Sequence, residues 1–479
     1  MRPPYFPART VLFHKEPNGV TYRVPALLYL SRSRCFLAFS EERLSPSDSQ
    51  AHLLVMRKGT FYRNYVEWED MHVLGTALLP GYRSMNPCPV YDDFTGTLFL
   101  FFIAVFGHTS ESYQLVTGRN VTHLCFICST DSGETWSPAT DLTEHVIGDT
   151  IKEWATFALG PGHGLQLKSG RLLIPAYAYR IACKECFGQL CQTTPRAFCF
   201  YSDTHGQTWR FGEPVRGPES VECQMVSVDE EDGTNVLYCN ARSPLGYRVQ
   251  ALSLDEGSVF QEGQLVQRLV EPGNGCHGSI VGFPAPLSLC HSLENHSYRP
   301  VHCCRHRTPR MAYSTIATDV SSNHIAPPDF LTPTWIVYSH PTRATTRKDL
   351  GLFLSLFPRD PDSWRGPWVI YEGPSAYSDL AYLELPPSPG SPPAVAFACL
   401  FECGSRTAYD EICFCIFTLY ELIDNLPQNV QLGNICEDFR GQQHQVPESS
   451  RRQDAQSAAD SHQGKQRKKN KLAEMCSVS

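Results

Sequence analysis

The sequence predicts an all-β fold of radially repeated sheets, for three reasons. Between Val11 and Leu422 the 479-residue chain is a succession of short apolar runs separated by turn residues. No long stretch has the 3.6-residue apolar period of an amphipathic helix. One turn sequence also recurs along the chain, which is typical of propellers and related repeat architectures.

The apolar runs are predicted to be strands because they are short and rich in β-branched and aromatic residues. Clear examples are LFLFF (98–102), RLLIPAYAY (171–179), NVLYCNA (235–241), TWIVYSH (334–340) and CFCIFTLY (413–420). Many short strands with turns between them indicate a sandwich, barrel or propeller rather than an α/β fold. We expect little helix, and residues 419–426 are the favoured short one.

The longest apolar run, residues 98–106, has nine residues. That is about half the length of a membrane-spanning helix. We therefore expect a buried strand there and no transmembrane helix.

The repeated turn has the pattern S-x-D-x-G-x-T-W. Residues 129–136 (STDSGETW) match it fully, 202–209 (SDTHGQTW) carry Thr204 in place of Asp, and 253–260 (SLDEGSVF) keep only Ser, Asp and Gly. In such a turn the Asp accepts backbone N–H bonds and the Gly permits a positive φ. We expect a structural role for this motif, and a weaker turn at Thr204.

Composition and charge exclude several classes of function. The net charge is −8 and 42% of residues are hydrophobic, so the chain can bury a core and bulk binding to nucleic acid is disfavoured. The first seven residues hold three prolines and no apolar run follows, so we expect no signal peptide. Most of the 20 cysteines are then expected to be reduced and buried.

No cofactor is expected, because the chain has neither a P-loop nor a dinucleotide-binding fingerprint. Two clusters contain residue types that bind metals. They are Cys183, Cys186 and Cys191, and the group His302, Cys303, Cys304 and His306. Neither has the paired spacing of a zinc finger, so we expect no metal.

We predict that residues 1–430 form one domain. Residues 284–333, rich in His, Cys, Ser and Pro, are interpreted as a long surface insertion of low complexity. Residues 431–479 are interpreted as a disordered basic tail, whose KQRKKNK run either contacts anionic lipid or is simply solvated.

The tetrapeptide YRVP (22–25), followed by the three repeated turns, resembles the animal exo-sialidase (neuraminidase) family. The resemblance covers roughly residues 10–425, and residues 124–148 with 183–191 resemble the plasma-membrane, ganglioside-cleaving type most. Further matching segments are GYRSMNPCP (81–89), ATFALGPGHG (155–164), IPAYAYR (174–180), VECQ (221–224), NARSP (240–244), AYSDL (376–380) and LFECG (400–404).

The resemblance implies a six-bladed β-propeller and a retaining exo-α-sialidase that needs no cofactor. By motif position, Arg23, Arg242 and Arg347 match the three arginines that bind the sialic acid carboxylate. A guanidinium suits this task because it stays charged and forms bidentate hydrogen bonds with a carboxylate.

The same match assigns the reacting groups. Tyr377 is the nucleophile, Glu222 the base that activates it, and Asp48 the general acid and base. A neutral tyrosine avoids the repulsion that a carboxylate nucleophile meets at an anomeric carbon already bearing a carboxylate. Because tyrosine has a pKa near 10, it needs a neighbouring base.

Other residues match the lining of the pocket for the N-acyl and glycerol groups: Arg43, Met85, Asn86, Glu111, Tyr177 and Tyr179. For the two tyrosines, packing of one into the core is the alternative. Glu41 is expected to orient Arg23 from behind.

The expected substrates are gangliosides, oligosaccharides and glycoproteins that end in sialic acid. A broad-specificity cytosolic type and a trans-sialidase remain alternatives. A sialic-acid-binding propeller without catalysis has no need of Asp48, Glu222 and Tyr377 together, so it is disfavoured. We expect peripheral association with the plasma membrane, with a cytoplasmic or endomembrane location as the alternative.

Overall fold

A computed structural model of the protein describes residues 4–62, 65–183, 191–230, 232–286, 332–385 and 394–427. Most of the predicted insertion lies outside these residues, as does the whole of the predicted basic tail. The described residues belong to one compact unit, Met1–Gln431.

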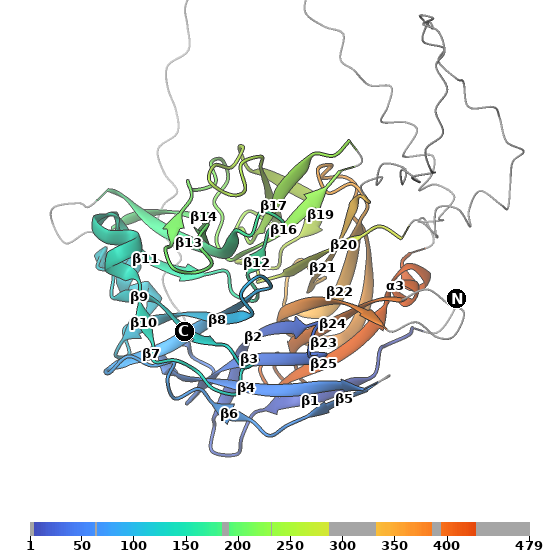
Figure 1. The fold of residues 1–479 in the computed structure, drawn as a ribbon, viewed down its shortest axis with the longest axis horizontal. Coiled ribbons are helices and arrows are strands. Elements are labelled where there is room, and N and C mark those ends of the chain that lie inside the picture. Colours follow the sequence, from blue (N-terminus) through green and yellow to red (C-terminus); the bar gives the residue numbers. More distant parts are fainter. Residues whose placement is uncertain are drawn as a thin grey trace, which may run out of the picture. The chain divides into compact units, whose positions relative to one another are not determined.

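Five antiparallel sheets follow one another along the chain and around the unit (Figure 1). The first holds β2 (Thr21–Leu30), β3 (Cys35–Arg43), β4 (Ala51–Tyr62), β5 (Tyr65–Trp68) and β6 (His72–Val73). The second holds β7 (Tyr82–Asp92), β8 (Thr97–Phe106), β9 (Thr122–Ser129) and β10 (Thr140–Asp141). The third holds β11 (Trp154–Leu159), β12 (Leu165–Gln166), β13 (Leu172–Cys183), β14 (Gln192–Ser202) and β15 (Arg210–Phe211). The fourth holds β16 (Cys223–Asp229), β17 (Asn235–Ala241), β18 (Tyr247–Ser253) and β19 (Gln264–Val270).

The fifth sheet has seven strands and includes the first strand of the chain. It holds β20 (Ser279–Pro284), β21 (Thr334–Pro341), β22 (Lys348–Ser355), β23 (Arg365–Leu385), β24 (Ala394–Cys403), β25 (Glu411–Thr418) and β1 (Arg9–His14). The long strand β23 pairs with β22 through its first half and with β24 through its second.

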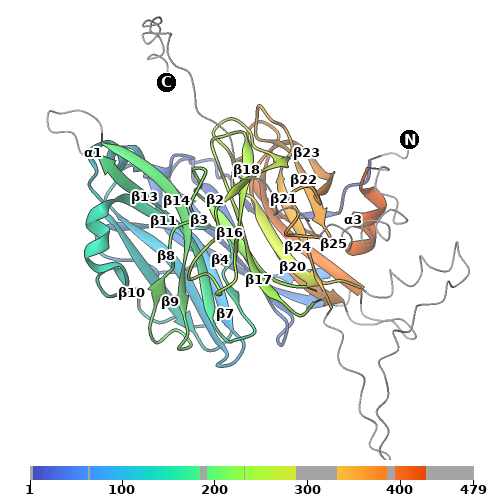
Figure 2. The same cartoon turned by 90° about the horizontal axis from the view of Figure 1, so that it is seen from above.

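Strands that open the sheets meet near the middle of the unit. β2 contacts both β7 and β23, and β20 contacts β16 and β23. Figure 2 shows the same sheets from above, after a turn of 90°. The all-β prediction is thus confirmed, and the arrangement is propeller-like.

A buried carboxylate, Asp379 on β23, joins several sheets at that centre. It accepts hydrogen bonds from the Leu27 backbone N (2.7 Å), Gln224 Nε2 (2.8 Å), Ser279 Oγ (2.8 Å) and His163 Nδ1 (2.8 Å). These donors come from β2, β16, β20 and the segment between β11 and β12. A single side chain therefore fixes the relative positions of four other segments.

The repeated turn has the same backbone in all three copies. Its fourth and fifth residues both have positive φ: 59° and 88° at Ser132 and Gly133, and 53° and 82° at His205 and Gly206. In each copy the Gly N–H donates to the hydroxyl of the first Ser, at 2.9 Å.

Thr204 does not break its turn. Its hydroxyl accepts the Thr208 N–H at 2.8 Å, as the Asp131 carboxylate accepts the Thr135 N–H at 2.9 Å. A hydroxyl oxygen thus serves as the acceptor in place of the carboxylate, and the weaker turn expected at Thr204 stays a prediction.

Two short α-helices occur in the described ranges. The predicted helix near residue 419 is confirmed as α3 (Leu419–Asn425), which starts at a capping box between Thr418 and Glu421. The other, α1 (Glu111–Thr117), was not expected. It is capped by Ser110, whose hydroxyl accepts the Tyr113 N–H, and it ends at Gly118 with φ 62°.

Candidate active site

A cleft of about 630 Å³ opens where the inner strands end. It is lined by every predicted catalytic and substrate-binding residue: Arg23, Arg43, Asp48, Met85, Asn86, Glu111, Tyr177, Tyr179, Glu222, Arg242, Arg347 and Tyr377. These side chains come from segments more than 350 residues apart in sequence, and the sheets bring them to one place.

The three predicted arginines converge on the Tyr377 ring. The guanidinium carbons of Arg23 and Arg347 lie 5.4 and 5.6 Å from its centroid. Arg242 Nη1 donates to the Tyr377 hydroxyl at 3.2 Å. Arg23 lies on β2, Arg242 directly after β17 and Arg347 directly before β22.

Arg23 is held by Glu402, a residue that the sequence reasoning missed. Arg23 Nε donates to Glu402 Oε1 at 2.8 Å, and the same carboxylate accepts the backbone N–H groups of Val24 (2.9 Å) and Tyr377 (3.1 Å). Burial opposes the charge on Arg23, but Glu402 outweighs it and raises the pKa of that guanidinium. Glu402 lies in the LFECG segment (400–404), and the family resemblance of that segment was the one sequence signal that could have identified this residue.

Two residues of the cleft that lie within strands have a backbone that L-residues rarely adopt. Val24 has φ 58° and Asn86 has φ 55°, and each occupies an irregular point in its strand pairing. Both backbone N–H groups are fixed by buried carboxylates, Val24 by Glu402 and Asn86 by Glu41 at 2.7 Å. Backbone strain of this kind persists only where the surroundings determine it.

Tyr377, Glu222 and Arg242 form one hydrogen-bonded group. The Tyr377 hydroxyl donates to Glu222 Oε1, and Arg242 Nη1 donates to Glu222 Oε2 at 2.9 Å. Burial and the Glu222 charge raise the pKa of Tyr377 far above its usual value. Burial opposes ionisation of Glu222 as well, but Arg242 and its other partners lower its pKa overall. The resting pair is therefore a phenol beside a carboxylate.

Asp48 lies at the open side of the cleft, with its side chain 69% exposed. Arg43 Nη1 donates to it, and Arg23 Nη1 lies 4.0 Å away. Although burial acts in the opposite direction, Arg43, Arg23 and Arg347 lower the pKa of Asp48.

The predicted contact of Glu41 with Arg23 is replaced by one with Arg43. Arg43 Nε donates to Glu41 Oε2 at 2.8 Å, and Glu41 Oε1 accepts the Asn86 N–H. Glu41 lies opposite Arg23 in the β2–β3 register, but the bulge after Arg23 leaves that guanidinium with Glu402. Glu41 thus supports a cleft arginine, though not the one that was expected.

The remaining lining residues surround the other end of the cleft. Tyr177 and Tyr179, two apart on β13, have ring centroids 6.0 Å from each other, and both line the cleft. Glu111 begins α1. Partial removal of water from the Glu111 carboxyl, together with the negative charges of Glu222 and Asp48, raises the pKa of Glu111 to about 7.

Outside the cleft, the described residues contain one group of possible metal ligands: Cys403, Glu411 and Cys413. Cys186 and the cluster from His302 to His306 lie outside the described residues. Among the helices that are described, none combines the length and apolar character of a membrane span.

The fold is found in solved proteins. A family model described as "BNR repeat-like domain" matches residues 36–385. The Hadza microbial sialidase Hz136 has a TM-score of 0.61 at 20% identity, covering 87% of this chain and 69% of its own. Trypanosoma rangeli sialidase, in complex with 2,3-difluorosialic acid, has a TM-score of 0.58 at 14% identity, covering 91% and 61%. The fold is thus that of a BNR-repeat, propeller-like protein.

Curated relatives are much closer in sequence. Human Sialidase-4 is 48% identical and covers 91% of this chain and 98% of its own. Mouse Sialidase-2 is 46% identical, covering 83% and 92%, and rat Sialidase-3 is 44% identical, covering 87% and 95%. The chain therefore belongs to the animal sialidase family, and it is an exo-α-sialidase that acts on sialylated glycoconjugates.

Proposed function

We propose that the protein releases terminal sialic acid from gangliosides, and from other sialoglycoconjugates, through a covalent tyrosyl-sialosyl intermediate. The observation that carries this proposal is the convergence of three arginines on the hydrogen-bonded pair of Tyr377 and Glu222. Such a cleft offers a receptor for one carboxylate directly beside a nucleophile and its base.

Arg23, Arg242 and Arg347 bind the substrate carboxylate in this mechanism. Arg23 keeps only part of its hydrogen-bonding capacity for ligand, because Glu402 occupies its Nε. Charged hydrogen bonds to a carboxylate are about twice as strong as neutral ones. The trio therefore fixes the anomeric carbon above the Tyr377 hydroxyl.

Tyr377 then attacks the anomeric carbon as its proton passes to Glu222. In the resting cleft the raised pKa of Tyr377 and the lowered pKa of Glu222 keep the proton on the phenol, so Glu222 is an ionised base that can accept this proton while the bond to the anomeric carbon forms. Attack makes the phenolate oxygen the new substituent of the sugar while the glycosidic oxygen leaves. The complex of the Trypanosoma rangeli sialidase with 2,3-difluorosialic acid is described as a covalent intermediate.

Asp48 supplies a proton to the leaving oxygen and then removes one from the attacking water. In the empty cleft the arginines keep the pKa of Asp48 low, which favours the carboxylate. A substrate carboxylate bound to Arg23 and Arg347 offsets those positive charges. We therefore expect substrate binding to raise the pKa of Asp48 and prepare it as the acid.

The rest of the cleft accommodates the sugar. Met85, Asn86, Glu111, Tyr177 and Tyr179 contact the N-acyl and glycerol groups, and Arg43 orients Asp48.

For the architecture we propose six blades within residues 1–430. When the seven-stranded sheet is counted as two blades joined by β23, these two and the four smaller sheets make six. We assign the three repeated turns, of which the second has Thr204 in place of Asp, as Asp-box turns of this propeller.

Two observations support the proposed preference for gangliosides and the plasma membrane. One is the resemblance of residues 124–148 and 183–191 to the plasma-membrane type, and the other is an exposed apolar surface beside the cleft. Phe106, Tyr113 and Val116, at the end of β8 and on α1, expose 53%, 50% and 45% of their surface close to Glu111. Such a patch suits peripheral contact with a lipid surface. Sedimentation with neutral vesicles, lost in a Tyr113→Ser and Val116→Ser variant, would support it; unchanged sedimentation would contradict it.

The first test measures sialic acid release, from ganglioside micelles and from a sialylated glycoprotein, by a variant without the nucleophile. The Tyr377→Phe substitution removes one oxygen and should lower kcat at least about 10³-fold, since it deletes the nucleophile. Circular dichroism should show the wild-type fold. Wild-type activity in this variant would contradict the assigned nucleophile.

The substrate and acceptor are tested with the unaltered enzyme. Strong release from gangliosides with little from glycoprotein supports the proposal, and equal release indicates a broad-specificity type. Added lactose should not be sialylated; a sialyl-lactose product would identify a trans-sialidase instead.

A further inference from the structure

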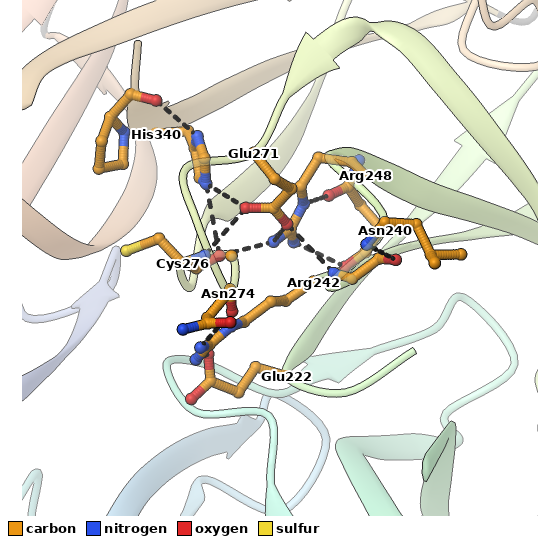
Figure 3. Close-up of polar contacts among 12 residues, drawn as sticks. Glu222, Asn240, Arg242, Arg248, Glu271, Asn274, Cys276 and His340 are labelled. Atoms are coloured by element: carbon orange, nitrogen blue, oxygen red, sulfur yellow. Dashed lines mark hydrogen bonds and ion pairs between the residues drawn. The ribbon is translucent and has the colours of Figure 1, made fainter. Parts of the chain in front are cut away.

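Two of the three arginines are anchored by one short loop, residues 272–276, and Figure 3 shows the contact of this loop with Arg242. The backbone carbonyl of Asn274 accepts from Arg242 Nε at 3.0 Å and from its Nη2 at 2.6 Å. The next carbonyl, that of Gly275, accepts from Arg347 Nη2 at 3.0 Å. Consecutive peptide groups thus set the spacing of two guanidinium groups.

The loop can make both contacts only in an unusual conformation. Asn274 and Gly275 have φ angles of 63° and 72°. A Cβ atom on Gly275 would lie 2.8 Å from Arg242 Cγ and 3.0 Å from its Nε. The position therefore requires glycine both for its backbone and for the close approach of Arg242.

Glu271 fixes one end of this loop and also the backbone beside Arg242. Glu271 Oε2 accepts the Cys276 N–H at 2.9 Å, which closes the loop, and Oε1 accepts the Ser243 N–H at 3.2 Å, beside Arg242. Its side chain is fully buried and plays no part in the reaction proposed above.

Two further buried side chains hold Glu271. Arg248 Nη1 donates to Glu271 Oε1 at 3.0 Å and to the Cys276 carbonyl at 2.8 Å. His340 Nε2 contacts Glu271 Oε2 at 3.0 Å, and its Nδ1 contacts the Pro341 carbonyl at 2.7 Å. Burial alone would favour the neutral acid, but Arg248 and His340 lower the pKa of Glu271 to about 2.

We propose that Glu271 is a positioning residue for substrate recognition: through the 272–276 loop it sets the spacing of Arg242 and Arg347 for the sialic acid carboxylate. The inference rests on the role proposed for the arginines. It predicts a loss of carboxylate recognition rather than a loss of chemistry, because Tyr377, Glu222 and Asp48 make no contact with Glu271 in the hydrogen bonds described.

Two variants test it by independent routes. Glu271→Gln keeps the shape but places an amide N–H₂ among N–H donors, which releases the loop. Gly275→Ala leaves the buried Glu271 group intact and displaces Arg242 directly. Trp209→Ala, which removes buried packing away from the loop, is the matched control for general destabilisation.

The measurement is competitive inhibition by free sialic acid and by its methyl ester, which lacks the carboxylate charge. The wild type should prefer the acid. In both variants that preference should fall about tenfold, as for a lost charged hydrogen bond, with KM raised and kcat changed less than KM. Trp209→Ala should keep the wild-type preference.

The outcomes separate the two proposals. A wild type that binds acid and ester equally would overturn the role of the arginines and the inference with it. A discriminating wild type whose preference survives in both variants would overturn the inference alone. If Glu271→Gln does not fold, Gly275→Ala decides.

Discussion

Two buried carboxylates, Glu402 and Glu41, hold both side chains and backbone of the cleft in place. Glu402 and Glu41 are both fully buried, and each pairs with one arginine while fixing the backbone N–H of a residue with positive φ. In the proposed mechanism, Val24 is the neighbour of the substrate-binding Arg23, and Asn86 contacts the substrate itself. The same carboxylates thus orient the arginines and maintain the backbone that presents them.

Glu111 gives the cleft a pH-dependent charge. Because its pKa is raised to about 7, its carboxyl is neutral below that pH and negative above it. The negative form repels the substrate carboxylate, so KM should rise as the pH increases from 6 to 8. Glu111→Gln should flatten that rise, by a few-fold at pH 8, which initial-rate kinetics at each pH would measure. The same slope in the variant and the wild type would exclude Glu111 as its source.

The sequence was sufficient to find the cleft residues that have a motif of their own, such as Tyr377 in AYSDL and Arg242 in NARSP. It did not show that Glu402 and Glu271 hold cleft arginines in place. It also predicted that Glu41 orients Arg23, whereas Glu41 pairs with Arg43. Supporting carboxylates are recognised by their partners, and those partners lie on other sheets or across a bulge. Their roles depend on tertiary geometry that a linear pattern does not contain.

The repeated turns act between elements by packing an aromatic ring on a neighbouring sheet. Trp136 lies 6.2 Å from Phe39 on β3, and Trp209 lies 4.6 Å from Phe101 on β8, measured between ring centroids. Trp209 Nε1 also donates to the Gly206 carbonyl at 3.0 Å. Each of these two turns therefore joins its own sheet to the preceding one.

Replacement of Trp209 by Ala should lower the free energy of unfolding by about 3–5 kcal/mol, because a large buried ring is removed. KM should stay within about twofold, since Trp209 packs near the start of β8 whereas Ile103 and Val105, near its end, line the cleft. Urea denaturation and steady-state kinetics give the two quantities. A large change in KM without a loss of stability would contradict this division.

Strands were easier to predict than their pairing. The runs at 98–102 and 235–241 lie in β8 and β17, as their β-branched and aromatic residues indicated. α1 was missed because seven residues with a Ser cap and a terminal Gly give little periodic signal. The sequence also did not predict that β23 pairs with two different strands. This is seen only from its partners, which are β22 up to residue 374 and β24 after it.

At the scale of the whole molecule, Asp379 joins segments from four sheets. Asp379→Asn keeps the volume but places an amide among donors from Leu27, Gln224, Ser279 and His163. We expect a loss of about 3 kcal/mol in unfolding free energy, as for a buried polar group left without its partners. Asp203→Asn, at an exposed ion pair, should change it by less than about 1 kcal/mol. Equal midpoints in urea for the two variants would contradict a central role for Asp379.

The pairing of β1 with β25 has a consequence for synthesis on the ribosome. Arg9 pairs with Cys415, so the first strand to emerge waits for a partner about 400 residues later in the chain. At about 5–20 residues per second, that wait lasts about 20–80 seconds. Throughout this interval the nascent polypeptide carries an unpaired apolar segment around Leu12 and Phe13, both buried in the finished protein. Molecular chaperones that shield such segments should therefore improve the yield of active enzyme.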